Sequence, residues 1–272
     1  MRSISRSARR ESSTFTAASV AQRWRSLLFP ELMVDDPVPR LEAWRDVLLP
    51  STWIATRDDS VIGYCYIQEY FETGYIRNVV VAKAARRSGV GRALMQAIAD
   101  YLRSRGKISW RLNVKPSNQA ALALYERMGM HAKYLARALR LPWSALPSLP
   151  AGNAVVAVLS SDRDAVIERQ FDVPRGQLAD ARGMGRLLLE AIAPVERACV
   201  GIAAFDPKFP GAFPFRVNDL DALAPLLSAM RQHVPADEHV NLVTEDDERL
   251  AALLISVGAT LRTEIVHMEG TL

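Results

Sequence analysis

The stretch Ala85–Leu94, "ARRSGVGRAL", places two glycines two residues apart among arginines, directly before an apolar helical pattern. Upstream, Gly74–Lys83, "GYIRNVVVAK", is rich in β-branched and aromatic residues, which is typical of a buried strand. Downstream, apolar residues recur at helical spacing from Val90 to Leu102, and Gly106 follows where a helix commonly ends. The sequence therefore predicts a strand, a glycine turn and a helix in succession.

A turn of this kind can hold an anionic group. The N–H groups at the start of a helix have no partner within it, and glycine lets the backbone approach a ligand closely. A dinucleotide-binding turn would need a third small residue where Leu94 stands, and an acidic ribose ligand about 20 residues later. A P-loop would need Gly-Lys-Ser/Thr at the helix start, which is also missing. A tight turn without a ligand is the simpler alternative.

The pattern Arg86-x-x-Gly89-x-Gly91 after a strand instead resembles the acyl-CoA pyrophosphate loop of the GCN5-related N-acetyltransferase (GNAT) superfamily. The family's second signature is an asparagine, a tyrosine seven residues later and a glycine four residues beyond. Asn118, Tyr125 and Gly129 match it position for position. They follow a predicted strand at 108–114 and lie on or beside a predicted helix. The resemblance covers roughly residues 40–141.

The resemblance implies an α/β (α+β) fold, in which two GNAT-like domains each have a mixed, splayed central sheet flanked by helices. It implies acetyl-CoA as the co-substrate, wedged between two parallel strands, with backbone groups of the first strand holding the pantetheine and polarising the thioester carbonyl. Asn118 would hydrogen-bond the pantetheine arm. Tyr125 would give a proton to the departing thiolate, or would be a core tyrosine on a helix face. The cofactor-binding residues implied are Val79, Val80, Val81, Arg86, Arg87, Ser88, Gly89, Val90, Gly91, Arg92, Asn118 and Tyr125.

The general base is where the sequence departs from the family. In the ribosomal-protein N-terminal acetyltransferases of this family, a glutamate five residues before the asparagine acts as base, and Asn113 stands at that position here. Asparagine does not accept an amine proton at neutral pH. Glu69 or Glu72 could take this role, directly or through water, unless both are solvated loop carboxylates. The acceptor amine therefore stays open between a small molecule and a peptide.

Composition bounds the class of protein. The chain has 272 residues, 49% hydrophobic and 24% charged, with a net charge of +4 from scattered arginines. No run approaches the roughly 18 apolar residues of a membrane span, and the first residues, "MRSISRSARRESST", lack the apolar core of a secretory signal. We expect a cytoplasmic monomer or homodimer whose first 12 or so residues form a flexible tail or contain a short strand. No basic–aromatic interleaving or recognition helix indicates nucleic acid.

Cysteine and histidine usage argues against metal or disulfide chemistry. Cys65 and Cys199 are too few for a disulfide framework, and no Cys/His cluster has zinc-site spacing. The four histidines are dispersed along the chain, and we interpret them as structural. We therefore expect neither a metal nor a membrane partner.

The second half is predicted to be a degenerate copy of the first. Pairing Gly63 with Gly201, Gly74 with Gly211 and Gly129 with Gly258 aligns the halves and puts Asp247 opposite Asn118 and Leu254 opposite Tyr125. Gly74 and Gly129 lie 55 residues apart but Gly211 and Gly258 only 47, and the missing eight fall at the phosphate loop. A similar glycine pair, Gly183 and Gly185, lacks a preceding strand and is interpreted as a turn into a strand.

The predicted organisation is a GNAT domain at 1–142, a Pro-rich linker at 143–153 and a degenerate GNAT-like domain at 154–272. The predicted function is transfer of an acetyl group from acetyl-CoA to an amine by direct attack on the thioester. The alternative is a catalytically weak acyl-CoA-binding regulatory protein, which Asn113 favours.

Overall fold

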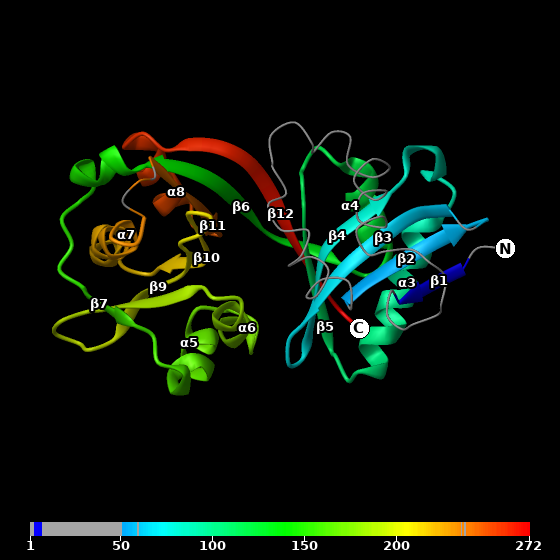
Figure 1. Cartoon of the computed structure of the whole chain (residues 1–272), viewed down its shortest axis with the longest axis horizontal. Helices are drawn as coiled ribbons and strands as arrows, with labels where there is room; N and C mark the ends of the chain where they lie inside the picture. The colour runs from blue at the N-terminus through cyan, green and yellow to red at the C-terminus, as the bar shows by residue number, and fades with distance from the viewer. Residues whose placement is uncertain (1–2, 7–50, 59, 235, 237) are drawn as a thin grey trace. The chain divides into compact units, whose positions relative to one another are not determined.

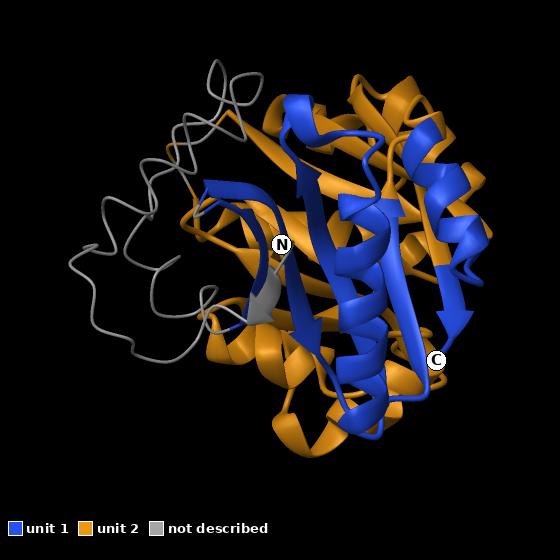
Figure 2. Cartoon of the chain, turned by 90° about the vertical axis from the view of Figure 1, so that its right-hand side faces the viewer, with its two compact units in different colours: residues 1–113, 120–131, 269–272 blue, residues 114–119, 132–268 orange. Residues whose placement is uncertain are grey.

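The computed structural model describes residues 3–6, 51–58, 60–234, 236 and 238–272, which form two compact units (Figures 1 and 2). The N-terminal unit comprises Met1–Asn113, Ala120–His131 and Glu269–Leu272. The C-terminal unit comprises Val114–Gln119 and Ala132–Met268. Residues 7–50 of the first predicted domain lie outside the described residues.

The N-terminal unit is built on a mixed sheet. Its strands are β1 (Ser3–Arg6), β2 (Thr52–Arg57), β3 (Ser60–Glu69), β4 (Thr73–Val81) and β5 (Ser109–Val114). They lie side by side in this order; β1 to β4 pair antiparallel, and β5 runs parallel to β4. The strand predicted before the glycine turn is thus confirmed as β4, and the strand predicted at 108–114 is confirmed as β5. The first 12 residues contain a short strand, β1, which was one of the two alternatives expected there.

Glycines bring the helix that follows β4 close to this sheet. The short η3 (Lys83–Ala85) leads into α3 (Val90–Ser104), and α4 (Gln119–Arg127) follows β5. A Cβ atom on Gly74 would clash with the side chain of Leu102, so glycine at this position lets α3 pack closely on β4. Both helices end as the sequence predicts, at glycines with positive φ, +71° at Gly106 and +83° at Gly129.

A β-bulge in β4 marks where the two parallel strands part. Tyr66 pairs with Asn78 and Ile67 with Ile76, so Arg77 is an extra residue in β4. The β4–β5 ladder runs from Thr73↔Ser109 to Ile76↔Leu112, ending at the residue before the bulge. Because a bulge bends and twists its strand, β4 diverges from β5 beyond this point. The splayed pair that the family resemblance implied is therefore present.

The C-terminal unit repeats this plan. Its strands lie in the order β12-β6-β11-β10-β9-β8-β7, and β10 and β11 are its parallel pair. The elements are β6 (His131–Pro142), η4 (Trp143–Ser148), β7 (Val155–Val158), η5 (Ser161–Arg163), α5 (Asp164–Gln170), α6 (Gln177–Gly183), β8 (Leu187–Ile192), β9 (Cys199–Asp206), β10 (Gly211–Val217), η6 (Leu220–Ala222), α7 (Leu223–Arg231), β11 (His239–Glu245), α8 (Glu248–Ser256) and β12 (Thr260–Thr271). Gly185 has φ +81° just before β8, which confirms the predicted turn into a strand.

Matching backbone contacts relate the two units residue by residue. Gly63 lies opposite Val81 in the β3–β4 ladder, and Gly201 lies opposite Val217 in the β9–β10 ladder. At the end of α4, Met130 N–H donates to the carbonyl of Tyr125 at 3.0 Å; at the end of α8, Ala259 N–H donates to that of Leu254 at 2.9 Å. The structure therefore agrees with the sequence pairing that sets Leu254 opposite Tyr125.

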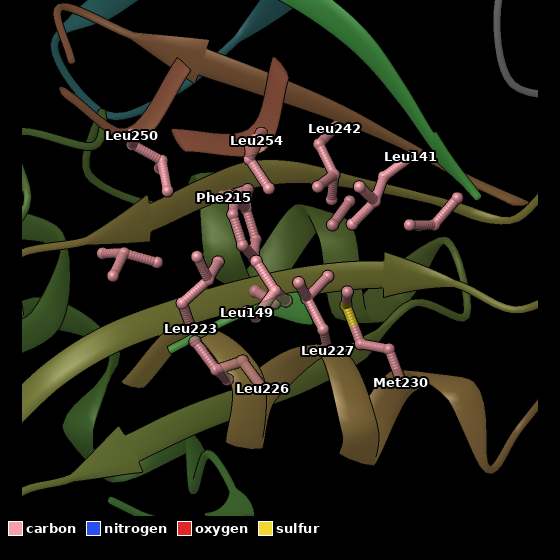
Figure 3. Close-up of a cluster of buried hydrophobic side chains, with 14 of the residues drawn as sticks. Leu141, Leu149, Phe215, Leu223, Leu226, Leu227, Met230, Leu242, Leu250 and Leu254 are labelled. Carbon is pink, nitrogen blue, oxygen red and sulfur yellow. The ribbon is translucent and has the colours of Figure 1, made fainter. Parts of the chain in front are cut away.

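The predicted Pro-rich linker is part of the C-terminal core. Trp143 and Leu149 are buried in a cluster with Phe215, Leu227 and other side chains from α7, β11 and α8 (Figure 3). The unit boundaries therefore differ from those predicted at 143–153. Prolines signal the break in regular structure, but they do not reveal that the apolar residues between them pack against a core.

Candidate functional site

The glycine turn between β4 and α3 is an ordered, exposed loop. The Ser88 hydroxyl donates to the Ala85 carbonyl at 2.8 Å, and Gly89 has the left-handed φ of +83° that glycine permits. The first helical bond runs from Ala93 N–H to the Gly89 carbonyl at 3.0 Å. The N–H groups of Gly89 to Arg92 therefore precede the helical ladder and are available to an anion.

Basic side chains surround this loop. Arg86, Arg87 and Arg92 are exposed, and the first turn of α3 contains no acidic residue. Arg86 Nε also donates to the Val81 carbonyl at 3.2 Å, and Arg57 of β2 donates to the Ser88 hydroxyl at 3.5 Å. Positive charge and the helix dipole therefore act in the same direction, in favour of a phosphate group.

The two glycines of the turn have different roles. Gly89 supplies the left-handed turn and is exposed. Gly91 lies in α3, where an added Cβ would be 3.3 Å from Cδ2 of Leu124 in α4 and 3.7 Å from Cγ2 of Val81. Gly91 therefore allows the start of α3 to approach α4, and its small size has a packing reason as well as any ligand-binding one.

The pairing of β4 with β3 decides which of its valines can present backbone groups to a ligand. Tyr64 lies opposite Val80, and Ala82 N–H donates to the Ile62 carbonyl at 2.9 Å. Because hydrogen-bonded and non-hydrogen-bonded pairs alternate in an antiparallel ladder, the main-chain groups of Val80 face β3. Those of Val79 and Val81 point the other way, toward β5, where the parallel ladder has already ended.

Tyr125 lies in α4, and its neighbour Leu124 and Val81 of β4 both lie within 4 Å of a Cβ atom placed on Gly91. Its side chain is 6% exposed, and burial, with a smaller contribution from Cys65, raises the pKa of its hydroxyl. Cys65 lies opposite Val79 in the β3–β4 ladder, so Tyr125 is within electrostatic reach of the point where β4 leaves β5. The structure thus brings Tyr125 and the outward-facing backbone of β4 to one region of the N-terminal unit.

Asn118 directly precedes α4, the helix that carries Tyr125. Its N–H donates to the Lys115 carbonyl at 2.9 Å, which closes the turn between β5 and α4. It belongs to the segment Val114–Gln119, which groups with the C-terminal unit. Its role in holding pantetheine stays a prediction.

The two glutamates considered as bases lie elsewhere. Glu69 accepts a hydrogen bond from the Tyr101 hydroxyl at 2.6 Å and lies 3.6 Å from Arg105 Nε and 3.9 Å from Lys107 Nζ. It is four residues along β3 from Cys65, about 13 Å at the rise of a strand. Glu72 is an exposed residue of the β3–β4 turn, whose carbonyl accepts from Ile108 N–H at 2.9 Å. These positions do not suit either residue to a base beside Val79.

Three features of this region were not predicted from the sequence: Cys65 opposite Val79, the bulge at Arg77 and the contact of Arg57 with the loop. Cys65 is a free, buried cysteine, and burial raises the pKa of its thiol. In the sequence, the only indication of this cysteine was its place in a buried, tyrosine-rich strand.

Among the described residues, no group of His, Cys, Asp and Glu could hold a metal ion, and no helix is long and apolar enough to cross a membrane.

Comparisons with known proteins place this geometry in context. Residues 21–130 match the acetyltransferase (GNAT) family. The [Ribosomal protein bS18]-alanine N-acetyltransferase of Salmonella typhimurium is 33% identical over 82 residues, which is 30% of this chain and 55% of that protein. The chain thus spans about half the length of the curated relatives it matches.

Solved structures extend the likeness beyond these residues. A GCN5-related N-acetyltransferase from Sphaerobacter thermophilus has a TM-score of 0.59 at 14% identity, covering 85% of this chain and 84% of the other. A tandem GNAT protein from the clavulanic acid biosynthesis pathway has a TM-score of 0.52 at 18% identity, covering 82% and 84%. At these identities the likeness establishes the fold over both units.

Proposed function

We propose that this chain is a member of the GNAT acetyltransferase family, and that it is an N-acetyltransferase that moves an acetyl group from acetyl-CoA to an amine. The observation that carries the proposal is that β4 leads into a basic helix start and, beyond the end of the β4–β5 ladder, directs backbone groups of Val79 and Val81 away from β3, near the helix that carries Tyr125. Each of these three features meets a separate need of acetyl transfer: binding the pyrophosphate, polarising the thioester and protonating the leaving group.

Residues of the loop and of β4 would bind acetyl-CoA. The N–H groups of Gly89 to Arg92 would hold the pyrophosphate, with the guanidinium groups of Arg86, Arg87 and Arg92 adding positive charge. The backbone groups of Val79 and the N–H of Val81 would pair with the pantetheine arm as an added strand would, whereas the Val81 carbonyl accepts Arg86 Nε and Val80 is directed toward β3. Asn118 would complete the set from the start of α4.

The chemistry follows from these positions. The neutral acceptor amine attacks the thioester carbonyl carbon, the new C–N bond forms and the C–S bond breaks. Backbone N–H groups on the free edge of β4 stabilise the carbonyl oxygen as it becomes negative. The departing thiolate takes the proton of the Tyr125 hydroxyl, and the proton lost by the amine returns to Tyr125 through water. No step in this scheme requires Glu69 or Glu72.

The acceptor is proposed only as an amine of a small molecule or peptide. The curated relatives are alanine N-acetyltransferases of ribosomal protein bS18, but Asn113 stands here where the family resemblance implies a glutamate base. Free buried Cys65 and Cys199 support a reducing, cytoplasmic setting, and we propose a monomer or homodimer.

The test of this function separates an enzyme from an acyl-CoA-binding regulator, the alternative that Asn113 favours. Purified protein is incubated with acetyl-CoA and a library of amines and peptides, thiol release is followed, and acetylated products are identified by mass spectrometry. We expect turnover of at least one amine, lost in Tyr125→Phe. Acetyl-CoA binding by calorimetry without turnover of any amine would favour the regulator, and absence of binding would refute both.

A further inference from the structure

The last four residues of the chain, Glu269–Leu272, belong to the N-terminal unit. Leu272 N–H donates to the carbonyl of Ile108, just before β5, at 2.9 Å. The Glu269 carboxylate lies 3.7 Å from Nε of Arg111 in β5 and 3.9 Å from Nε2 of His131. The end of β12 is thus fixed beside β5 by a backbone hydrogen bond and by charge.

Gly270 is the closest point of approach in this contact. It is buried, and a Cβ atom there would lie 2.7 Å from the Gly129 carbonyl oxygen, 3.0 Å from Nε1 of Trp110 and 3.2 Å from the Met130 Cα. Two of these neighbours are backbone atoms and the third is a buried indole. No side chain fits at this position unless the backbone of Gly129 and Met130 moves.

The backbone that Gly270 touches is hydrogen-bonded directly to Tyr125. Met130 N–H donates to the Tyr125 carbonyl at 3.0 Å, and Gly129 N–H donates to the Glu126 carbonyl at 3.0 Å. These bonds close the last turn of α4 at the left-handed Gly129. A displacement at Gly129 and Met130 is therefore passed to the backbone of Tyr125 through one hydrogen bond.

We infer that Gly270 is a positioning residue for Tyr125, and that the C-terminal segment Glu269–Leu272 is a working part of the acetyl-transfer unit. The inference rests on the proposed function for the role of Tyr125. The contact of Gly270 with the end of α4 fixes where the phenol lies relative to β4. Proton delivery by Tyr125 would therefore depend on the segment Glu269–Leu272.

The first variant is Gly270→Ala. We expect kcat to fall about tenfold or more, because small displacements of a catalytic group cost this much, while the Kd for acetyl-CoA stays within about twofold. Gly183→Ala is the matched control, since it adds the same methyl group at a position with nothing within 4 Å. A chain ending at Gly270 is the second variant, which removes the Leu272–Ile108 bond without adding an atom and should also lower kcat.

A double-mutant cycle tests whether Gly270 acts through Tyr125. In a Tyr125→Phe background, Gly270→Ala should lower the remaining kcat by less than about twofold. The phenylalanine has no hydroxyl to deliver a proton, so its exact position no longer affects proton transfer. The same fold reduction in both backgrounds would overturn the inference in favour of general destabilisation.

Hydrogen exchange provides a readout that needs no activity. The Met130 amide should exchange faster in Gly270→Ala than in wild type, and no faster in Gly183→Ala. Unchanged exchange at Met130 would refute the positioning contact even if acetyl transfer occurs. Absence of transfer by wild type, together with faster exchange in Gly270→Ala, would refute the proposed function and leave the contact established.

Discussion

Glu69 is held by its neighbours in a structural role. Its carboxylate receives the Tyr101 hydroxyl and lies near two cations, Arg105 and Lys107, at the end of α3. These contacts connect β3 to the end of α3, and we propose that Glu69 has this structural role.

We predict that Glu69→Gln keeps kcat within about twofold of wild type and lowers the free energy of unfolding by about 1 kcal/mol, the scale for one partly exposed charged hydrogen bond. Urea denaturation and steady-state kinetics measure the two quantities. Glu72→Gln, at an exposed turn position, is the control and should change neither. A tenfold loss of kcat in Glu69→Gln, with a changed pH profile, would restore it as the base.

Tyr125 is the residue that we propose as the proton donor to the leaving thiolate. We predict that Tyr125→Phe lowers kcat by about 10² or more, the usual scale for a general acid. The Kd for acetyl-CoA should barely change, because the phenol is proposed to act on the leaving thiolate. Full turnover by Tyr125→Phe, measured where chemistry limits the rate, would leave Tyr125 only a packing role.

The same residue predicts part of the pH dependence. Burial raises the pKa of the Tyr125 hydroxyl above its ordinary value near 10. The folded protein therefore keeps this proton at pH values where a solvated tyrosine begins to lose it. We therefore expect that ionisation of Tyr125 causes no decline in kcat between pH 7 and 10. Any decline in the pH profile of the wild type in this range should also appear in that of Tyr125→Phe.

At the scale of elements, the sequence predicted what depends on local chemistry. The β-branched run of β4, the apolar periodicity of α3 and the glycines at 89, 106 and 129 are all read from neighbouring residues. The bulge at Arg77 could not be predicted, because it exists only in the register between β3 and β4. The same register decides that the main-chain groups of Val79 and Val81 point away from β3, whereas those of Val80 face it.

The turn before α3 carries its own prediction. Gly89→Glu should weaken acetyl-CoA binding at least about tenfold, because a carboxylate about 4 Å from a phosphate costs on the order of 4 kcal/mol before screening. Gly89→Ala is the matched control, since it shares the strain of a left-handed φ, about 1 kcal/mol, without the charge. Calorimetry on folded proteins gives both values. Gly91→Glu is a poorer variant, because Leu124 crowds that site.

Equal affinity for acetyl-CoA in Gly89→Glu and Gly89→Ala would mean that the pyrophosphate lies elsewhere. Weak binding by both would show that the loop conformation, rather than charge at Gly89, controls affinity. Only selective loss in Gly89→Glu supports an anion at this turn.

At the scale of the whole molecule, the sequence predicted two related halves but not their boundaries. The paired glycines report local turns and close helix–strand contacts, which recur in both units. The assignment of Glu269–Leu272 to the N-terminal unit and of Ala132–Pro142 to the C-terminal unit depends on long-range strand pairing. Side-chain alternation in a strand does not identify its partner strand.

In the C-terminal unit, intramolecular contacts occupy the two places that correspond to the proposed acetyl-CoA site: the helix start after β10 and the region beyond the β10–β11 ladder. Its helix start is capped from within, because the Asp219 carboxylate accepts the Asp221 N–H at 3.0 Å. Beyond the short β10–β11 ladder, Arg216 of β10 forms an ion pair with Glu245 at the end of β11. The Glu245 carboxylate also accepts the Tyr134 hydroxyl at 2.7 Å.

These contacts predict that each chain binds one acetyl-CoA, in the N-terminal unit. Only two residues separate β10 from η6, whereas η3 and the glycine turn separate β4 from α3. Asp219 and Asp221 would repel incoming phosphates, each by about 4 kcal/mol at 4 Å before screening, and Leu254 offers no proton. Native mass spectrometry with excess acetyl-CoA should therefore show a single adduct, which Gly89→Glu removes. Two adducts of similar affinity, or one that persists in Gly89→Glu, would mean that the C-terminal unit binds the cofactor.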